Sequence, residues 1–416
     1  MRFDTIIIGG GLSALTCGIK TAKAGRKTAI IAAGESSLSF NSASFGLLSR
    51  LPDGTPVDEP LSAIGRLPQG HPYSKVGEEA VRKYAAAAKP FFAECGINLT
   101  EAKNNLWRYT SSGKMRRCWL AMEDTTVFTT EDDKIGTSAL IVNLKGFADF
   151  FPGFIAEALE KKGLTCRCEE VELGALKDLR SNPSEMRSTN IARAMESAKV
   201  RGQLISAIST LKQGEDILIL PQVFGLEDTA ALNEVRKGVG MPVTFVSTLM
   251  PSVPGIRAQK LLKKAFQAAG GTLLMGDSVT EGQFEDGILK SVTTVNLGDY
   301  PLEADSFVLA TGSFHGKGLA SDFTHIYEPV FGLDVDAIQA RDGWYSEEFF
   351  SRQPWLGFGV STDSDFRVSL DGNTVGNFYA TGAVLSGAEP LYEGSGAGIA
   401  IITAMKVADK IMEGQI

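Results

Sequence analysis

The sequence is poor in cysteine and histidine, has no long apolar run and carries no excess of positive charge. Its five cysteines are scattered over 416 residues, and only the CRC stretch at 166–168 brings two close together, so no disulfide framework is expected. The same scarcity leaves no repeated cysteine spacing for an iron–sulfur cluster or a structural zinc. We therefore expect neither a cluster nor a metal site in this chain.

The charge and the apolar runs argue against two further classes of protein. A formal net charge of −8 does not supply the basic face that nucleic-acid binding requires. No apolar run approaches the roughly 20 residues that span a bilayer, and no basic segment of a signal peptide precedes the first expected strand. The expected location is the cytoplasm, with any membrane association peripheral or through a partner.

What the sequence does contain begins with a βαβ pattern. DTIII at 4–8 is typical of a buried parallel strand, a helix is expected from about residue 12 to Lys23, and KTAIIAA at 27–33 predicts a second strand. Between strand and helix, GGGLSA fits G-x-G-x-x-[GA], in which glycines bring backbone N–H groups to a phosphate at a helix N-terminus. The predicted phosphate-binding turn consists of Gly9, Gly10, Gly11, Leu12, Ser13 and Ala14.

The second strand lacks the acidic residue that usually ends it in a dinucleotide-binding unit. It ends in Ala32 and Ala33, and the first acid is Glu35. Two interpretations stay open. Glu35 is displaced by the loop and still reaches the ribose of FAD, or no adenosine is bound and the cofactor is FMN. A nicotinamide dinucleotide is favoured less than either.

Two later strands end in the same Ala-Thr-Gly sequence and so bring bare backbone to a ligand. They contribute Ala310, Thr311 and Gly312 in one case and Gly382 and Ala383 in the other. With the N-terminal unit they resemble the two-dinucleotide-domain flavoproteins of the fumarate reductase and glutathione reductase type. In that group an acid after the last strand holds the ribityl chain, whereas this chain has Ala383, a second departure from the FAD pattern.

Further candidates for flavin contact lie in two glycine-bearing or serine-rich segments. EGSGAGIA begins a helix whose N–H groups, at Gly394, Ser395 and Gly396, suit the anionic N1/O2 edge of a reduced flavin. The SFNSASFG loop follows the second strand, where such proteins wrap the cofactor. Its candidates for contact with the ribityl chain and ring are Asn41, Ser42, Ser44 and Gly46.

The order of these elements predicts an α/β fold of the Rossmann-like flavoprotein class, with an inserted α/β domain. The flavin-binding domain is expected to comprise residues 1–59 and 256–416, and the insert residues 60–255. Within the insert, helices are expected at 77–95 and 146–163 and strands at 216–221 and 243–249.

Several long stretches identify a family resemblance that covers nearly the whole chain. They include MRFDTIIIGGGLSAL, LLSRLPDGTPV, HPYS, NIAR, LPQVFGLED, PSVPGIR, EPVFGLDV, QPWLGFGV and ATGAVLSGAEP. The chain resembles the B-subunit family of bacterial anaerobic glycerol-3-phosphate dehydrogenases.

The resemblance implies an FMN-containing subunit that works with an FAD-bearing catalytic subunit and a membrane-associated iron–sulfur subunit. It also implies oxidation of sn-glycerol 3-phosphate to dihydroxyacetone phosphate, with electrons passed to quinone and finally to fumarate or nitrate. The chain would then lie at the inner face of the cell membrane through its partners. A stand-alone FAD oxidoreductase of another small substrate and a non-catalytic scaffold subunit stay open as alternatives.

The catalytic residues are the least determined part of this prediction. Oxidation of a secondary alcohol needs a base, and of the three histidines His315 is the best placed, directly after a flavin-facing strand, ahead of His71 and His325. Arg257 at a helix start is a candidate for an anion contact, and equally an arginine that caps a carbonyl or pairs with an acid. Arg116 and Arg117 are favoured as a solvated face.

Overall fold

A computed structural model describes residues 1–414, which form two compact units. Unit 1 consists of Met1–Ser37, Gly46–Gly96 and the chain from Leu262 onward, and unit 2 of Leu38–Phe45 and Ile97–Leu261. The helices of unit 1 are α1 (Leu12–Lys23), α2 (Pro72–Val76), α3 (Glu78–Glu94), α10 (Pro390–Glu393) and α11 (Gly396–Glu413). Its strands are β1 (Arg2–Ile8), β2 (Thr28–Ala32), β10 (Thr272–Met275), β11 (Val279–Glu285), β12 (Ile288–Thr294), β13 (Leu302–Leu309), β14 (Ala320–Ser321), β15 (Ile326–Tyr327), β16 (Val335–Asp336), β17 (Gly359–Val360), β18 (Arg367–Leu370) and β19 (Asn373–Ala380).

The large sheet of unit 1 has a group of neighbouring strands that all pair in parallel. Its strands follow the order β10-β2-β1-β13-β12-β11, and β19 also pairs with β13. The pairs β10–β2, β2–β1, β1–β13 and β13–β19 are all parallel. Strand β1 lies between β2, which follows it in the chain, and β13, which comes much later. The strand order therefore reverses at β1, and the carboxyl ends of β2, β1 and β13 lie at this reversal. Ligands of open α/β sheets bind at such an edge.

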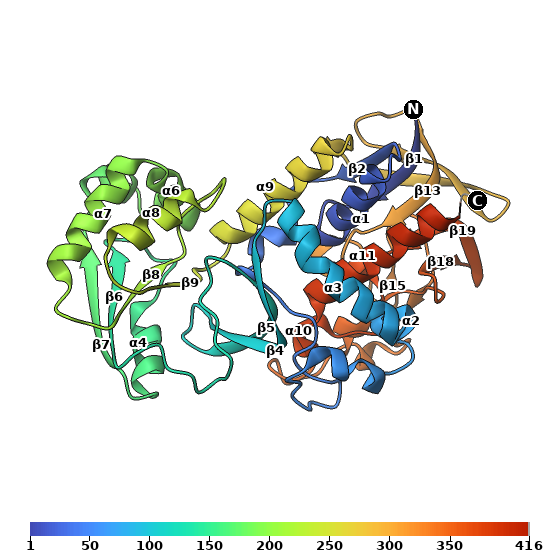
Figure 1. The fold of residues 1–416 in the computed structure, drawn as a ribbon. Coiled ribbons are helices and arrows are strands. Elements are labelled where there is room, and N and C mark those ends of the chain that lie inside the picture. The colour runs from blue at the N-terminus through green and yellow to red at the C-terminus, as the bar shows by residue number, and fades with distance from the viewer. Residues whose placement is uncertain (415–416) are drawn as a thin grey trace. The chain divides into compact units, whose positions relative to one another are not determined.

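Three helices of unit 1 pack side by side. Helix α11 lies against α1 and against α3 (Figure 1). The Nζ of Lys20 in α1 lies 2.7 Å from Asp409 in α11, and the hydroxyl of Tyr84 in α3 donates to the same carboxylate at 2.9 Å. The three helices therefore share one half-buried carboxylate. No helix within residues 1–414 combines the length and apolarity needed to cross a membrane.

Unit 2 contains a second parallel sheet and a small antiparallel one. The parallel sheet has the order β7-β6-β8-β9, and the antiparallel one the order β3-β5-β4. Their strands are β3 (Ser44–Phe45), β4 (Leu99–Tyr109), β5 (Met115–Met122), β6 (Ser138–Leu144), β7 (Thr165–Val171), β8 (Ile217–Pro221) and β9 (Val243–Val246). The helices are α4 (Pro152–Glu160), α5 (Lys177–Ser181), α6 (Ser188–Met195), α7 (Ala198–Leu211) and α8 (Ala230–Gly238), and α9 (Val253–Ala268) runs across the boundary of the units.

The structure confirms the α/β class and the predicted elements, but it divides the chain differently from the predicted insert at 60–255. Residues 60–96 belong to unit 1, because α3 packs on α11. The segment Leu38–Phe45 belongs to unit 2, because β3 pairs with β5 and places Ser44 opposite Ala121. The later boundary lies inside α9, after Leu261.

Candidate functional site

The turn between β1 and α1 can be built only with glycine at its first position. Gly9 has φ +118°, and a Cβ there would lie 2.2 Å from the carbonyl oxygen of Ala310 at the end of β13. A Cβ at Gly10 would lie 2.7 Å from the Cβ of Ala32 at the end of β2. These two glycines let the ends of three strands close together.

Gly11 differs from its two neighbours because it has room for a side chain. Its φ is −82°, and a Cβ would meet only the Cβ of Ser36, at 4.0 Å. Gly11 is the N-cap of α1, and within residues 1–414 no side chain caps that helix. The first N–H groups of α1, at Leu12, Ser13 and Ala14, therefore lack the usual side-chain acceptor. A bare, uncapped helix start of this kind suits a phosphate.

Because Gly11 has room for a side chain and Gly9 does not, substitutions at the two positions should affect flavin binding and folding differently. Gly11→Val is expected to leave the melting temperature close to wild type and to abolish flavin retention, because the new side chain fills the space through which a phosphate reaches the N–H groups. Gly9→Ala is expected to lower the melting temperature as well, since it strains φ and collides with β13. Flavin absorbance per chain and thermal unfolding check both variants, and full flavin content in Gly11→Val would contradict the assignment of the turn.

The two Ala-Thr-Gly segments reach the same sheet edge. At the end of β13, the hydroxyl oxygen of Thr311 is buried and has no hydrogen-bond partner within the described residues. At the end of β19, Gly382 has φ +80°, and a Cβ there would lie 2.5 Å from the Oγ of Ser13. The structure thus brings together the predicted residues of the glycine turn, of Ala310–Gly312 and of Gly382 with Ala383, and it leaves an unused hydroxyl among them.

The loop before α11 is held by a buried hydrogen bond between a histidine and a carboxylate. Glu393 is 1% exposed, and its carboxylate accepts from the Oγ of Ser395 at 2.8 Å. The Nε2 of His71, which is 0% exposed, lies 3.2 Å from the same carboxylate. The Nδ1 of His71 accepts from the backbone N–H of Tyr73, so Nε2 carries the proton and donates. The pair fixes the loop that contains Gly394, Ser395 and Gly396.

Gly46 belongs to this loop region. A Cβ on Gly46 would lie 2.1 Å from the carbonyl oxygen of Gly394, and its own carbonyl accepts from the N–H of Gly398 at 2.8 Å. Of the four candidates in the SFNSASFG loop, Gly46 is therefore the one that lies in unit 1 beside the predicted flavin segments.

The lowered pKa of the Glu393 carboxylate makes the stability of the fold depend on pH. Burial raises its pKa, but the hydrogen bonds that the carboxylate accepts from His71, from the backbone N–H of Glu389 and from Ser395 outweigh burial and hold the pKa below the usual value. A depressed carboxyl pKa stabilises the fold above the unfolded pKa of about 4.3, and this contribution is lost as pH falls through the folded pKa.

We therefore expect Glu393→Gln to unfold at a lower temperature than wild type at pH 7, by a loss of about 1.5–3 kcal/mol. Between pH 5 and pH 3 its melting temperature should fall less steeply than that of the wild type. Glu94→Gln, in the exposed pair with Lys23, is the matched control and should follow the wild type. Parallel curves for Glu393→Gln and wild type would contradict this account.

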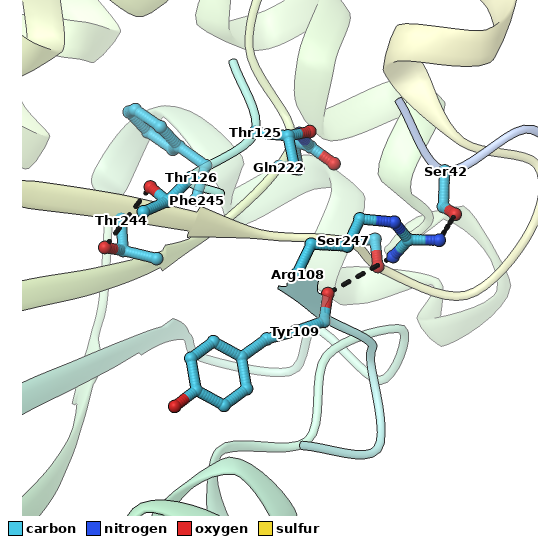
Figure 2. A pocket seen from close by; sticks show the side chains of 9 residues that line it. All are labelled: Ser42, Arg108, Tyr109, Thr125, Thr126, Gln222, Thr244, Phe245 and Ser247. Carbon is cyan, nitrogen blue, oxygen red and sulfur yellow. Dashed lines mark hydrogen bonds between the residues drawn. The ribbon is translucent and has the colours of Figure 1, made fainter. Parts of the chain in front are cut away.

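Asn41, Ser42 and Ser44 lie in unit 2, and their polar groups bind other residues of that unit. The side-chain amide of Asn41 donates to the carbonyl of Ser44 and accepts from its N–H, at 2.8 and 3.0 Å. The hydroxyls of Ser42 and Ser44 accept from the guanidinium of Arg108, and Figure 2 shows the bond to Ser42. Because β3 pairs with β5, this segment belongs to unit 2, and the contact of these three residues with the ribityl chain stays a prediction.

Arg257 is an internal structural residue. It is 1% exposed, its Nη2 lies 2.8 Å from Asp124, and its Nη1 donates to the carbonyls of Phe224 and Gly225 at 3.3 and 2.6 Å. Asp124 is itself 0% exposed. Of the two alternatives for Arg257, the structure shows the arginine that pairs with an acid and caps carbonyls, not an anion contact for a ligand.

Arg257→Gln is expected to destabilise unit 2 by about 3–5 kcal/mol, because it leaves the carboxylate of Asp124 buried without a cation. Flavin content at a temperature well below unfolding should stay at the wild-type level. Chemical denaturation and flavin absorbance check both statements. Loss of flavin at an unchanged free energy of unfolding would contradict the structural role and indicate that Arg257 contacts the ligand.

The remaining predicted residues are exposed or packed on aromatic rings. His315 follows the Thr311–Gly312 edge, is exposed and packs edge-on against Trp355, with ring centroids 5.8 Å apart. His325 is exposed beside Asp322. Arg116 is exposed, and Arg117 stacks over the ring of Trp107. His315 stays a predicted base, and neither His71, which is fully buried, nor His325 lies at the end of a flavin-facing strand.

Glu35 forms an exposed ion pair with Lys263. Its carboxylate, at the end of β2, lies 3.1 Å from the Nζ of Lys263, and its side chain is 72% exposed. The position where an acid usually ends this strand is occupied by Ala32, which is buried. The edge therefore offers backbone for a phosphate and no carboxylate for adenosine at the usual place.

The sequence comparisons identify a flavin-binding family. The family model described as "FAD binding domain" matches residues 4–399. The B subunit of the anaerobic glycerol-3-phosphate dehydrogenase of Pectobacterium carotovorum is 38% identical over 99% of both chains, and that of Aliivibrio fischeri is 35% identical over 99% of this chain and 96% of the other. A solved 3-ketosteroid Δ1-dehydrogenase from Sterolibacterium denitrificans aligns over all of both chains at 10% identity, with a TM-score of 0.46. The family assignment rests on the sequence comparisons.

Proposed function

We propose a role for this chain from the premise that it belongs to the family of anaerobic glycerol-3-phosphate dehydrogenase B subunits and is a flavin-dependent oxidoreductase. The proposed cofactor is FMN. The proposed reaction of its complex is the oxidation of sn-glycerol 3-phosphate to dihydroxyacetone phosphate, with electrons delivered to quinone and then to fumarate or nitrate. The observation that supports the proposal is the sheet edge of unit 1, where the uncapped start of α1 suits a phosphate and Ala32 stands where an acid for adenosine usually ends the strand.

Different residues of this edge would contact the phosphate and the ring of a flavin. The N–H groups after Gly11 receive the terminal phosphate, and the hydroxyl of Thr311 supplies a buried donor or acceptor. The N–H groups at the start of α11, fixed by the Glu393–His71 pair, favour negative charge on the flavin ring. A bound flavin supplies acceptance of a hydride and release of single electrons.

The proposed partners are an FAD-bearing subunit and a membrane-associated iron–sulfur subunit, which would hold this chain at the inner face of the cell membrane. The support is the scattered arrangement of the five cysteines, three of which, Cys17, Cys95 and Cys118, are buried. Burial raises the pKa of the Cys17 thiol to about 12, so that thiol is a poor cluster ligand. Electrons leaving this chain would then need a relay in another subunit.

The cofactor is tested by denaturing the purified full chain and identifying the released chromophore by mass. FMN is expected at about one per chain; release of FAD would overturn the cofactor assignment, and release of no flavin would favour a scaffold subunit.

The assembly is tested by following quinone reduction with glycerol 3-phosphate. The isolated chain is expected to reduce quinone poorly or not at all, and addition of the two partner subunits to restore turnover. Robust quinone reduction by the chain alone would contradict the proposed relay.

A further inference from the structure

Five apolar side chains of unit 1 are exposed on the stretch of chain between β14 and β17. The exposed fraction is 84% for Phe323, 83% for Phe349 and 98% for Phe350, and Ile338 and Tyr345 are half exposed. We call these five residues the aromatic surface. Single exposed apolar residues are ordinary, but several on one stretch indicate a surface that binds a protein or a membrane.

Specific contacts hold the backbone that presents the first part of the aromatic surface. The guanidinium of Arg341 lies 5.5 Å from the ring centroid of Phe323 and 5.7 Å from that of Trp344, and it donates to the carbonyl of Phe323 at 2.9 Å. The indole N–H of Trp344, which is buried, donates to the carbonyl of Ile338 at 2.6 Å. Arg341 and Trp344 therefore bring the hairpin after β14 together with the segment around Ile338.

Phe349 and Phe350 lie in a loop that Gln353 closes. Their rings contact edge to face, with centroids 5.0 Å apart. The Nε2 of Gln353 donates to the carbonyls of Ser346 and Glu348 at 3.3 and 3.1 Å, and its Oε1 accepts from the backbone N–H of Ser346 at 2.9 Å. A loop that is ordered before binding loses less conformational entropy when a partner binds to it.

The aromatic surface is connected to the predicted flavin edge through one tryptophan. The ring of Trp355 packs edge to face against Phe314 and His315, with centroids 5.7 and 5.8 Å apart, and both residues closely follow Gly312 at the end of β13. The backbone N–H of Trp355 donates to the carbonyl of Trp344 at 3.0 Å. The contacts therefore run without interruption from the end of β13 to the aromatic surface.

A second connection leads to the loop before α11. Arg352, which follows the phenylalanine pair, forms an ion pair with Glu389, and the backbone N–H of Glu389 donates to the carboxylate of Glu393 at 3.1 Å. The aromatic surface is thus connected to two of the segments predicted to contact the flavin. Electron transfer slows steeply as the distance between two redox groups grows, so a subunit that takes electrons from the flavin has to dock close to these segments.

Acidic side chains flank the aromatic surface and decide between two kinds of partner. Asp342, Glu347 and Glu348 are exposed, and none of them forms an ion pair with another residue of the range 1–414. The anionic lipids of a cytoplasmic leaflet would repel three carboxylates. A protein surface with lysine or arginine around an apolar pocket would attract them. The charge therefore favours a protein partner over a membrane.

We propose that the aromatic surface docks the subunit that takes electrons from the flavin. Phe349 and Phe350 enter an apolar pocket of that subunit, and Glu347 and Glu348 meet cations at the rim of the pocket. A few aromatic anchors inside a polar rim supply most of the binding free energy of such interfaces. The inference rests on the proposed function, because it takes the iron–sulfur subunit as this partner.

The test measures the affinity of the flavin-loaded full chain for each purified partner subunit by biolayer interferometry. Phe349→Ser/Phe350→Ser is expected to weaken binding of the iron–sulfur subunit by at least about tenfold, and Glu347→Lys/Glu348→Lys by about fivefold. Melting temperature and flavin content should stay at the wild-type level, because these side chains are exposed. Tyr300→Ser, at an exposed aromatic residue just before β13 and so at the opposite end of that strand, is the control and should bind as wild type.

Unchanged affinity for the iron–sulfur subunit in folded Phe349→Ser/Phe350→Ser would overturn the proposal and leave the proposed assembly standing. Weaker binding of the FAD-bearing subunit alone would overturn it in favour of that subunit. Wild-type binding to vesicles of phosphatidylethanolamine and phosphatidylglycerol that the double variant loses would overturn it in favour of a membrane, and a wild-type dimer that the variant loses would do so in favour of a second copy. A wild-type chain that binds neither subunit would overturn the proposed partners together with this inference.

Discussion

The approach of Gly9 to the carbonyl of Ala310 is the constraint on which the flavin edge depends. With any side chain at Gly9, the ends of β1 and β13 would have to separate, because the first atom of that side chain would lie 2.2 Å from the carbonyl oxygen. The close pairing carries the Ala-Thr-Gly segment of β13 to the start of α1, and the same requirement recurs where Gly382 meets Ser13. At Gly9 and Gly382, backbone therefore occupies space that side chains fill elsewhere in the sheet. Exposed backbone N–H groups are what a phosphate binds.

Features encoded over short stretches could be predicted from the sequence, and features that join distant stretches could not. The βαβ unit, β13, β19 and the start of α11 each show their apolar runs and glycines within a few residues, so their carboxyl ends could be expected at one edge. The His71–Glu393 pair joins residues 322 apart, and neither HPYS nor EGSG indicates its partner. Ser42 and Ser44 were expected near the flavin because they follow β2 in sequence, but pairing of β3 with β5 decides their neighbours. Arg108 gives no local signal at all, since only the fold shows that it is buried and that no carboxylate within residues 1–414 lies within ion-pair distance of it.

Arg257 and Arg108 show why an arginine cannot be interpreted from its position in the sequence. Arg257 is the fifth residue of α9, close to a helix start, and a cation near a helix start by itself suggests a bound anion. The anion exists, but it is the carboxylate of Asp124, 133 residues earlier in the chain. Arg108 lies in a strand that offers no such argument, yet its guanidinium meets only neutral oxygens. The counter-ion, not the local element, distinguishes the two arginines.

Charge is thus stabilised differently in the two units. At the edge of unit 1, N–H groups have fixed directions and need no desolvated charge, which suits a cofactor that stays bound. In unit 2, the free energy of folding has already covered the desolvation of Arg108, and Ser42 and Ser44 set the orientation of its guanidinium. Neutral hydroxyls offset only part of the cost of burying a cation, so other interactions of unit 2 have to supply the rest.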